Sequence, residues 1–233
     1  MGDEINSQSL ATRPFVPRIW LTVFAGLFAI SFILLAGYGF GSVHGMFADP
    51  ARMTVCIGLF LLAILTPICG CNLSSGAQID LSNDWIFAVM LVAGMAMGWS
   101  AAHCDRRNIY TCGGQAVRWT GVAIFGIGAL LRVFSILTLG SRFTVWVALQ
   151  TDHHLTTTGL YRLIRHPSYT GAALTVLGWA ITFRSLIGVV LALIVLLPLL
   201  SRIGAEEQLL IEEFGDEYRQ YQRRTWRLVP FVY

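Results

Sequence analysis

The sequence predicts an all-α protein that is built as a multi-pass transmembrane helical bundle. Hydrophobic residues make up 55% of the 233 positions, and charged residues only 12%. The mean hydropathy is +0.65, which is well above the value for a water-soluble domain of ordinary composition. Six apolar stretches alternate with polar segments along the chain, and this pattern is typical of repeated membrane crossings.

Each stretch can be compared with the roughly 20 residues that a helix needs to cross the bilayer core. The stretches cover residues 19–40, 55–69, 85–101, 117–139, 169–183 and 186–200. Two of them are comfortably long enough, and the others are short. The last two are separated only by Arg184 and Ser185, and one helix through both would be roughly 48 Å long, too long for an ordinary crossing. We therefore expect a tight helical hairpin and six crossings.

The arginines beside these stretches indicate an orientation. The first stretch lacks the features of a cleavable signal, so we expect it to be retained, with the N-terminus in the cytosol. Six crossings then place the 139–168 loop and a helical C-terminal tail on the cytosolic side as well. The arginines expected there are Arg13, Arg18, Arg142, Arg162, Arg165, Arg202, Arg219, Arg223, Arg224 and Arg227. Arg106, Arg107 and Arg118 favour the opposite orientation.

Composition excludes several classes of function. The net charge of +3 is too small and too scattered for a nucleic-acid surface. The five cysteines are an odd number without C-x-x-C spacing, so we expect neither a disulfide framework nor a metal site. A disulfide between Cys104 and Cys112 stays open as an alternative. No strand is followed by a glycine-rich nucleotide loop, which excludes a soluble Rossmann-type enzyme.

Two polar clusters flank the predicted hairpin. Before it the chain reads DHHLTTTGLYRLIRHPSYTG, and after it SRIGAEEQLLIEEFGDEYRQYQRR. Such groups are costly inside lipid unless they are paired or face a cavity. An antiparallel hairpin returns Arg202 to the level of His166 and Tyr169, and a helix puts Arg202 and Glu206 on one face. We therefore expect the two clusters to meet and form a polar pocket.

The compound pattern of these clusters carries a resemblance. H-x-L-x-T-x-G-x-Y-x-x-x-R-H-P-x-Y-x-G, then a hairpin, then R-x-x-x-E-E-x-x-L-x-x-x-F-G-x-x-Y-x-x-Y resembles the isoprenylcysteine carboxyl methyltransferase family and its phospholipid-methyltransferase-like relatives. The match extends over about residues 130–230. It implies a catalytic core at residues 119–233, preceded by an accessory or substrate-access region at residues 1–118.

The resemblance also implies a cofactor and a site. S-adenosylmethionine would bind in a cytosol-facing pocket formed by the 152–169 loop, the hairpin and the tail, and a lipophilic substrate would enter from the bilayer. The residues implied in cofactor binding are His153, Leu155, Gly159, Tyr161, Arg165, His166, Tyr169 and Glu207. Arginine and imidazole suit the carboxylate of this cofactor, and glutamate suits its ribose diol. Arg202 is expected to hold the acceptor carboxylate, with Glu206 orienting it.

The acceptor is not fixed by the pattern. Methyl transfer to a carboxylate needs mainly positioning and desolvation, whereas an amine or thiol needs a base. An isoprenylated cysteine carboxylate is the leading acceptor, and a phospholipid amine or a small thiol is the alternative. A non-catalytic lipid-binding or transport protein of the same fold is a further alternative, although transporters tend to place ionisable groups near the bilayer midplane.

Simpler roles compete for some of these residues. Arg202 and Glu206 are also explained by an ordinary ion pair on a helix surface, and Tyr161 and Tyr169 by interfacial aromatics. Pro167 is expected to mark the first turn of a helix. Arg132 is left open between pairing inside the bundle and reaching the pocket. The arginines expected to touch anionic headgroups are Arg223, Arg224 and Arg227, near Trp226.

Overall fold

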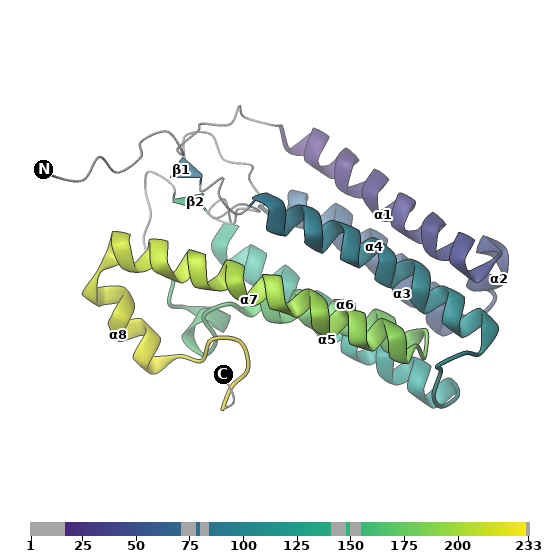
Figure 1. Cartoon of the computed structure of the whole chain (residues 1–233). Helices are drawn as coiled ribbons and strands as arrows, with labels where there is room; N and C mark the ends of the chain where they lie inside the picture. The colour runs from purple at the N-terminus through teal and green to yellow at the C-terminus, as the bar shows by residue number, and fades with distance from the viewer. Residues whose placement is uncertain (1–16, 71–77, 80–83, 141–147, 150–154, 232–233) are drawn as a thin grey trace, which may run out of the picture.

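A computed structural model describes residues 17–70, 78–79, 84–140, 148–149 and 155–231. Long helices lie side by side in this part of the chain and form an elongated bundle (Figure 1). They are α1 (Arg18–Phe40), α3 (Pro50–Ile68), α4 (Asp84–Arg107), α5 (Gln115–Leu139), α6 (Pro167–Thr182) and α7 (Leu186–Phe214). Each corresponds to one of the six predicted apolar stretches, so the predicted helical bundle is confirmed.

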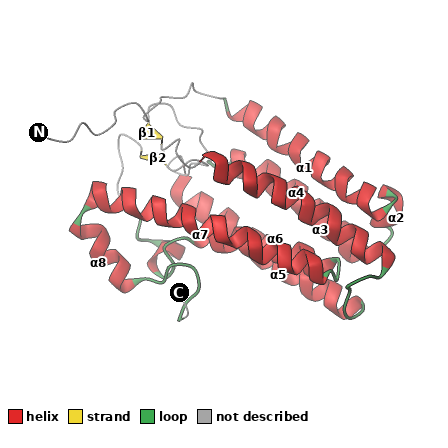
Figure 2. Cartoon of the chain, viewed as in Figure 1, coloured by secondary structure: helices red, strands yellow, loops and turns green. Residues whose placement is uncertain are grey.

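Short elements complete the described chain. They are the helices α2 (Val43–Phe47) and α8 (Asp216–Arg224), the 3-10 helix η3 (Gly159–Arg162), and the strands β1 (Gln78–Ile79) and β2 (Ala148–Leu149). The two strands pair antiparallel, with Gln78 opposite Leu149. Apart from this two-residue ladder, the regular structure of the described residues is helical (Figure 2).

Several helices are longer than the apolar stretches that predicted them. Helix α3 begins at Pro50 because the Asp49 side chain accepts hydrogen bonds from the backbone N–H of Ala51 and Arg52, which caps the helix ahead of the apolar residues. Helix α7 continues beyond Leu200 as far as Phe214. Hydropathy finds the buried or lipid-facing part of a helix, not its polar ends.

Four helices of the described chain are long and apolar enough to cross a membrane. These are α1, α3, α5 and α7. Helix α6 has 16 residues, fewer than the roughly 20 that span the bilayer core. The structure therefore supports an integral membrane protein, whereas six crossings and the cytosolic side of the tail stay predictions.

The predicted hairpin is formed by α6 and α7. Only Phe183, Arg184 and Ser185 separate the two helices. Arg184 adopts the left-handed conformation with φ of 54°, and the Ser185 hydroxyl caps α7 by accepting a hydrogen bond from the Gly188 N–H. The tight turn predicted from two residues between the apolar stretches is confirmed.

The hairpin is fixed to the bundle through glycines that bring α5 and α6 into backbone contact. A Cβ atom added at Gly128 would lie 2.7 Å from both the Gly171 oxygen and the Thr175 nitrogen. A Cβ atom added at Gly171 would lie 2.6 Å from the Gly128 oxygen. These distances are shorter than van der Waals contact, so the two helices could not stay this close with any other residue at these positions.

A variant pair tests this packing. We expect Gly128→Ala to destabilise the protein by about 1–3 kcal/mol, because the added methyl group meets backbone atoms that cannot move separately. Gly126→Ala is the control on the same helix, since a Cβ atom there meets nothing within 4 Å and alanine favours helix. The thermal unfolding midpoint in detergent should fall for Gly128→Ala alone, and equal midpoints for the two variants would contradict the packing argument.

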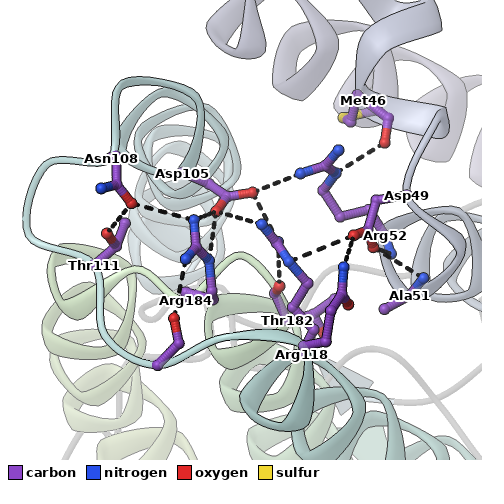
Figure 3. Close-up of polar contacts among 12 residues, drawn as sticks. Met46, Asp49, Ala51, Arg52, Asp105, Asn108, Thr111, Arg118, Thr182 and Arg184 are labelled. Carbon is purple, nitrogen blue, oxygen red and sulfur yellow. Dashed lines mark hydrogen bonds and ion pairs between the residues drawn. The ribbon is translucent and has the colours of Figure 1, made fainter.

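An ion cluster closes the end of the bundle at the hairpin turn (Figure 3). Its centre is Asp105 near the end of α4, whose side chain is fully buried. Asp105 binds the guanidinium groups of Arg52 at 2.9 Å, Arg118 at 2.8 Å and Arg184 at 2.8 Å. These arginines come from α3, α5 and the α6–α7 turn. One carboxylate thereby joins four segments of the chain.

Asp49 extends this cluster at the start of α3. Its carboxylate accepts a hydrogen bond from Gln115 Nε2 at 2.7 Å and lies 3.5 Å from Arg118 Nε. Burial acts to raise the pKa of Asp49, but the hydrogen bonds from Gln115 and the Arg52 backbone and the charges of Arg118 and Arg52 outweigh it, and the pKa is lowered. Arg118, which favoured the opposite orientation from sequence, is therefore a buried partner of two carboxylates.

The described cysteines form no disulfide. Cys56, Cys69, Cys104 and Cys112 are free, and Cys71 lies outside the described residues. The disulfide between Cys104 and Cys112 that the sequence left open is therefore not formed.

Removing the central carboxylate of the cluster should destabilise the bundle strongly. Asp105→Asn removes the shared counter-charge of Arg52, Arg118 and Arg184, and breaking a buried pair on one side costs about 3–5 kcal/mol. Asp216→Asn is the matched control, because Asp216 pairs with Arg219 on the surface and exposed pairs contribute little. Thermal unfolding in detergent distinguishes the two, and an Asp105→Asn protein as stable as the control would refute the role of the cluster.

Candidate functional site

The two polar clusters predicted at the open end of the hairpin meet. The Tyr169 hydroxyl in the first turn of α6 donates to Glu206 Oε2 at 2.8 Å, and His166 Nε2 lies 3.2 Å from Glu207 Oε1. Both glutamates are on the charged extension of α7. The contacts lie where α6 begins and α8 follows α7, at the end of the bundle opposite to the hairpin turn (Figure 1). The predicted convergence is confirmed.

Glu207 is the centre of this site. Its Oε1 atom lies 2.9 Å from Arg165 Nε and 3.2 Å from His166 Nε2, and its Oε2 atom lies 3.0 Å from Arg227 Nη2. Only 10% of its side chain is exposed. A buried carboxylate is stable when cationic and hydrogen-bonding partners surround it, so Glu207 holds the side chains of Arg165, His166 and Arg227 in fixed positions.

A second set of contacts links Arg202 to Glu206. Arg202 Nε donates to the Tyr169 hydroxyl at 2.9 Å, and that hydroxyl in turn donates to Glu206. Glu206 is more accessible than its neighbour, with 33% of its side chain exposed, and lies 3.9 Å from His166 Nδ1. Tyr169 therefore orients the arginine and the glutamate together, on the side of the site that a ligand can reach.

The backbone fixes the arginine and histidine from the other direction. After α8 the chain runs parallel to the segment before α6, with the Arg165 N–H donating to the Trp226 oxygen at 2.8 Å. The Trp226 N–H donates to the Leu163 oxygen at 3.0 Å, and the His166 N–H to the Arg227 oxygen at 3.2 Å. This bridge positions Arg165, His166 and Arg227 beside Glu207.

Three buried tyrosines cover the site from η3 and α8. The Tyr221 hydroxyl donates to the backbone oxygen of Tyr161 at 2.6 Å. Burial raises the pKa of Tyr161, and it raises the pKa of Tyr221 to about 12. Tyr218 is also buried with a raised pKa, and its hydroxyl has no hydrogen-bond partner among the described residues. All three are therefore neutral phenols, and that of Tyr218 is left with an unused donor.

The predicted site residues divide into three groups. Those that the structure joins by direct contacts are Arg165, His166, Tyr169, Arg202, Glu206 and Glu207. The Tyr161 backbone oxygen accepts a hydrogen bond from Tyr221. Leu155 lies in the segment that leads to η3, and Gly159 is the first residue of η3. Gly159 has φ of 60°, a conformation that favours glycine. His153 lies outside the described residues.

Sequence reasoning was wrong about Arg227 and silent about two tyrosines. Arg227 was expected to touch lipid headgroups, but it binds Glu207. Tyr218 and Tyr221 are the two tyrosines at the end of the compound pattern, and no role was assigned to them from sequence. Because residues three apart lie on the same face of a helix, their spacing could have indicated that both are buried. Arg132, left open from sequence, places Nη1 3.5 Å from the Ser168 oxygen and hydroxyl at the start of α6.

The described residues contain no group of three or more His, Cys, Asp or Glu side chains arranged to hold a metal ion. The polar groups that converge on the site are instead guanidinium, imidazole, phenol and carboxylate groups. This donor set suits an organic ligand that carries both charged ends and hydroxyl groups.

Comparison with known proteins places the site within a family match. Residues 119–212 match the model of the isoprenylcysteine carboxyl methyltransferase family, which confirms the resemblance over this part of the chain. The matched segment includes both Arg165 and Glu207, which meet at the open end of the hairpin, and it ends before α8.

Relatives of known name agree with this match. The chain is 32% identical over 119 residues to a probable protein-S-isoprenylcysteine O-methyltransferase of Oryza sativa subsp. indica, an alignment that covers 50% of this chain and 62% of the relative. It is 34% identical over 131 residues to the protein-S-isoprenylcysteine O-methyltransferase of Mus musculus, covering 54% and 46%. The chain thus spans less than two thirds of the length of these relatives.

A solved structure is also similar to this chain. It is that of the eukaryotic intramembrane Ras methyltransferase, an isoprenylcysteine carboxyl methyltransferase, with a TM-score of 0.48 and 19% sequence identity. The superposition covers 93% of this chain and 88% of the solved chain.

Proposed function

We propose that this protein is an integral-membrane methyltransferase that uses S-adenosylmethionine to methylate the carboxylate of an isoprenylated cysteine or a similar lipophilic acceptor. The observation that carries the proposal is the contact between the two polar clusters, with Tyr169 bonded to both Arg202 and Glu206. The match of the family model to residues 119–212 and the names of the relatives support the same reaction.

The residues of the site fit the proposed cofactor. When bound, S-adenosylmethionine supplies a methyl group on a sulfonium centre. Arg165 and His166 offer donors for its carboxylate, and Glu206 offers an acceptor for its ammonium group or ribose diol. The unpaired hydroxyl of Tyr218, buried close to the charges of Glu206 and Glu207, supports the same assignment, because a bound ligand would satisfy this donor.

The remaining cofactor-binding residues act around this core. Glu207 positions Arg165 and His166 and is not itself the main contact of the ligand, because three side chains already bind its carboxylate oxygens. Tyr161 closes the site from η3. We place His153, Leu155 and Gly159 in the segment that covers the cofactor, as the family pattern implies.

Arg202 is the residue proposed to hold the acceptor carboxylate. The Tyr169 hydroxyl fixes Arg202 Nε, and Glu206 fixes the hydroxyl, so the guanidinium is oriented before the substrate arrives. Transfer to an ionised carboxylate needs no proton to be removed, and correct placement of the two reactants is the main requirement.

The site is proposed to face the cytosol. At the opposite end of the bundle, the positive charges of Arg52, Arg118 and Arg184 are neutralised in part by Asp105 and Asp49. At the site end, Arg162, Arg219, Arg223 and Arg224 are exposed. At the opposite end Arg106 and Arg107 are exposed, so the site end carries the larger number of these exposed arginines, in agreement with the tendency of cytosolic segments to carry more arginine.

Cofactor binding and acceptor choice test the proposal directly. In a folded detergent sample we expect calorimetry to show saturable binding of S-adenosylmethionine. Radiolabelled methyl transfer, measured side by side, should go to a prenylcysteine and not to phosphatidylethanolamine or a small thiol. A folded protein without cofactor binding would refute the methyltransferase function, and transfer to phosphatidylethanolamine alone would refute the carboxylate acceptor.

Single substitutions separate the proposed roles. Arg202→Ala should retain cofactor binding but lower kcat by about 10²-fold or more, since the acceptor loses its orientation. His166→Ala should remove cofactor binding. Arg219→Ala is the control, because Arg219 is exposed and pairs with Asp216 on α8; it should change neither quantity. Full activity in Arg202→Ala would show that the catalytic assignment is wrong.

A further inference from the structure

The segment after α8, residues 225–231, presents large apolar side chains on its outer side. Phe231 is 85% exposed, Val229 45% and Trp226 38%. The rings of Trp226 and Phe231 pack against each other with centroids 5.6 Å apart. Leu163, which the backbone bridge places beside Trp226, is 52% exposed. These residues form one apolar surface that the other described residues do not cover.

The exposure of Trp226 follows from the direction of its neighbour. In an extended segment, successive side chains point to opposite sides. Arg227 points inward and binds Glu207, so Trp226 points outward. The outward position of the aromatic ring is therefore fixed by the same contact that completes the candidate site, and it is not a random conformation of a chain end.

This surface lies at the level where the apolar bundle begins. The Thr170 hydroxyl, in the first turn of α6, donates to the backbone oxygen of Leu228 at 2.8 Å. Val229 and Phe231 follow directly. In Figure 1 the chain after α8 first turns back toward the bundle. The apolar side chains are thus placed beside the first turn of a bundle helix, at the height of a membrane boundary.

Basic residues border this surface on its polar side. Arg223 and Arg224 occupy the last turn of α8, directly before residues 225–231, and both are exposed. Arg162 is exposed in η3, next to Leu163. The acidic residues of α8 are in its first turn, where Asp216 pairs with Arg219. Helix α8 is therefore positive at the end that meets the apolar surface.

We infer that residues 225–231, with Arg162, Leu163, Arg223 and Arg224, form an anchor that binds anionic phospholipids of the surrounding bilayer. Aromatic side chains favour the membrane–water boundary, and guanidinium groups bind lipid phosphate with charge-assisted hydrogen bonds. Juxtamembrane arginines are attracted to anionic leaflets. The surface has guanidinium groups beside it on α8 and η3, and its backbone contacts the first turn of α6 at Leu228, which matches the order of headgroup and acyl chain.

Lipid bound at the anchor should stabilise the candidate site. The backbone of Trp226 and Arg227 is joined to Arg165 and His166 by two hydrogen bonds, and a third joins Trp226 to Leu163. Lipid contacts that hold Trp226 at the membrane boundary would therefore also hold the segment that carries Arg165 and His166. The inference does not depend on methyl transfer, because thermal unfolding can be followed without cofactor or substrate.

The test uses the full chain in nanodiscs of phosphatidylcholine or of an equal mixture with phosphatidylglycerol. We expect the unfolding midpoint to be about 4–8 °C higher in the mixture. The double variant R223Q/R224Q should lose this difference. The matched control R106Q/R107Q, at the opposite end of the bundle where both arginines are exposed, should keep it. Equal midpoints for the native protein in both lipids would overturn the inference, as would a difference that survives in R223Q/R224Q.

Further experiments identify the source of the anionic group. Phe231→Ser should reduce the difference between the two lipid mixtures, because the apolar part of the anchor is weakened while all arginines stay. Inorganic phosphate added to phosphatidylcholine nanodiscs should not raise the midpoint, and a rise equal to that from phosphatidylglycerol would overturn the lipid assignment. An acidic peptide that raised the midpoint as much as phosphatidylglycerol does would also overturn the lipid assignment, because the partner would then be a protein.

Discussion

The structure depends on the pairing of buried carboxylates with cationic side chains at both ends of an apolar bundle. Removing a charge from water costs several kcal/mol unless partners compensate for it. Asp105 has three arginines around it, and Glu207 has Arg165, Arg227 and His166. Each carboxylate gathers partners from separate segments, so neither can be satisfied unless those segments are assembled. The α6–α7 hairpin is consequently held at its turn and at its open end by the same kind of interaction.

The two ends nevertheless differ in access. The Asp105 side chain has no exposed surface, and its contacts are internal to the bundle. Beside Glu207, in contrast, Glu206 keeps a third of its side chain exposed and shares Tyr169 with Arg202. A cluster closed to solvent can only stabilise, whereas a cluster with an accessible carboxylate and an oriented guanidinium can also bind a ligand. We therefore propose the open end as the functional site, although the chemistry of the two ends is similar.

Local patterns predicted the hairpin and the meeting of its two polar clusters, because both follow from adjacent apolar stretches and from helical spacing. The sequence could not predict the Asp105 cluster, whose arginines lie 53, 13 and 79 positions away, since no periodicity connects them. Arg227 was misplaced for the same reason. Its direction is decided by the parallel backbone bridge to the segment before α6, and a charge near a tryptophan looks the same whether it faces lipid or a buried glutamate.

The extension of α7 beyond its apolar part has a consequence for the site. Because Arg202 and Glu206 lie on the same continuous helix as the membrane-spanning residues, their positions are set by helical register and not by a loop. Each added residue would move them about 1.5 Å along the axis and rotate them by about 100°. The position of Tyr169 is set in the same way by the helical register of α6, counted back from the α6–α7 turn. The glycine contacts that fix α6 to α5 and the capped turn at Ser185 therefore act on the site at a distance, by keeping Tyr169 between Arg202 and Glu206.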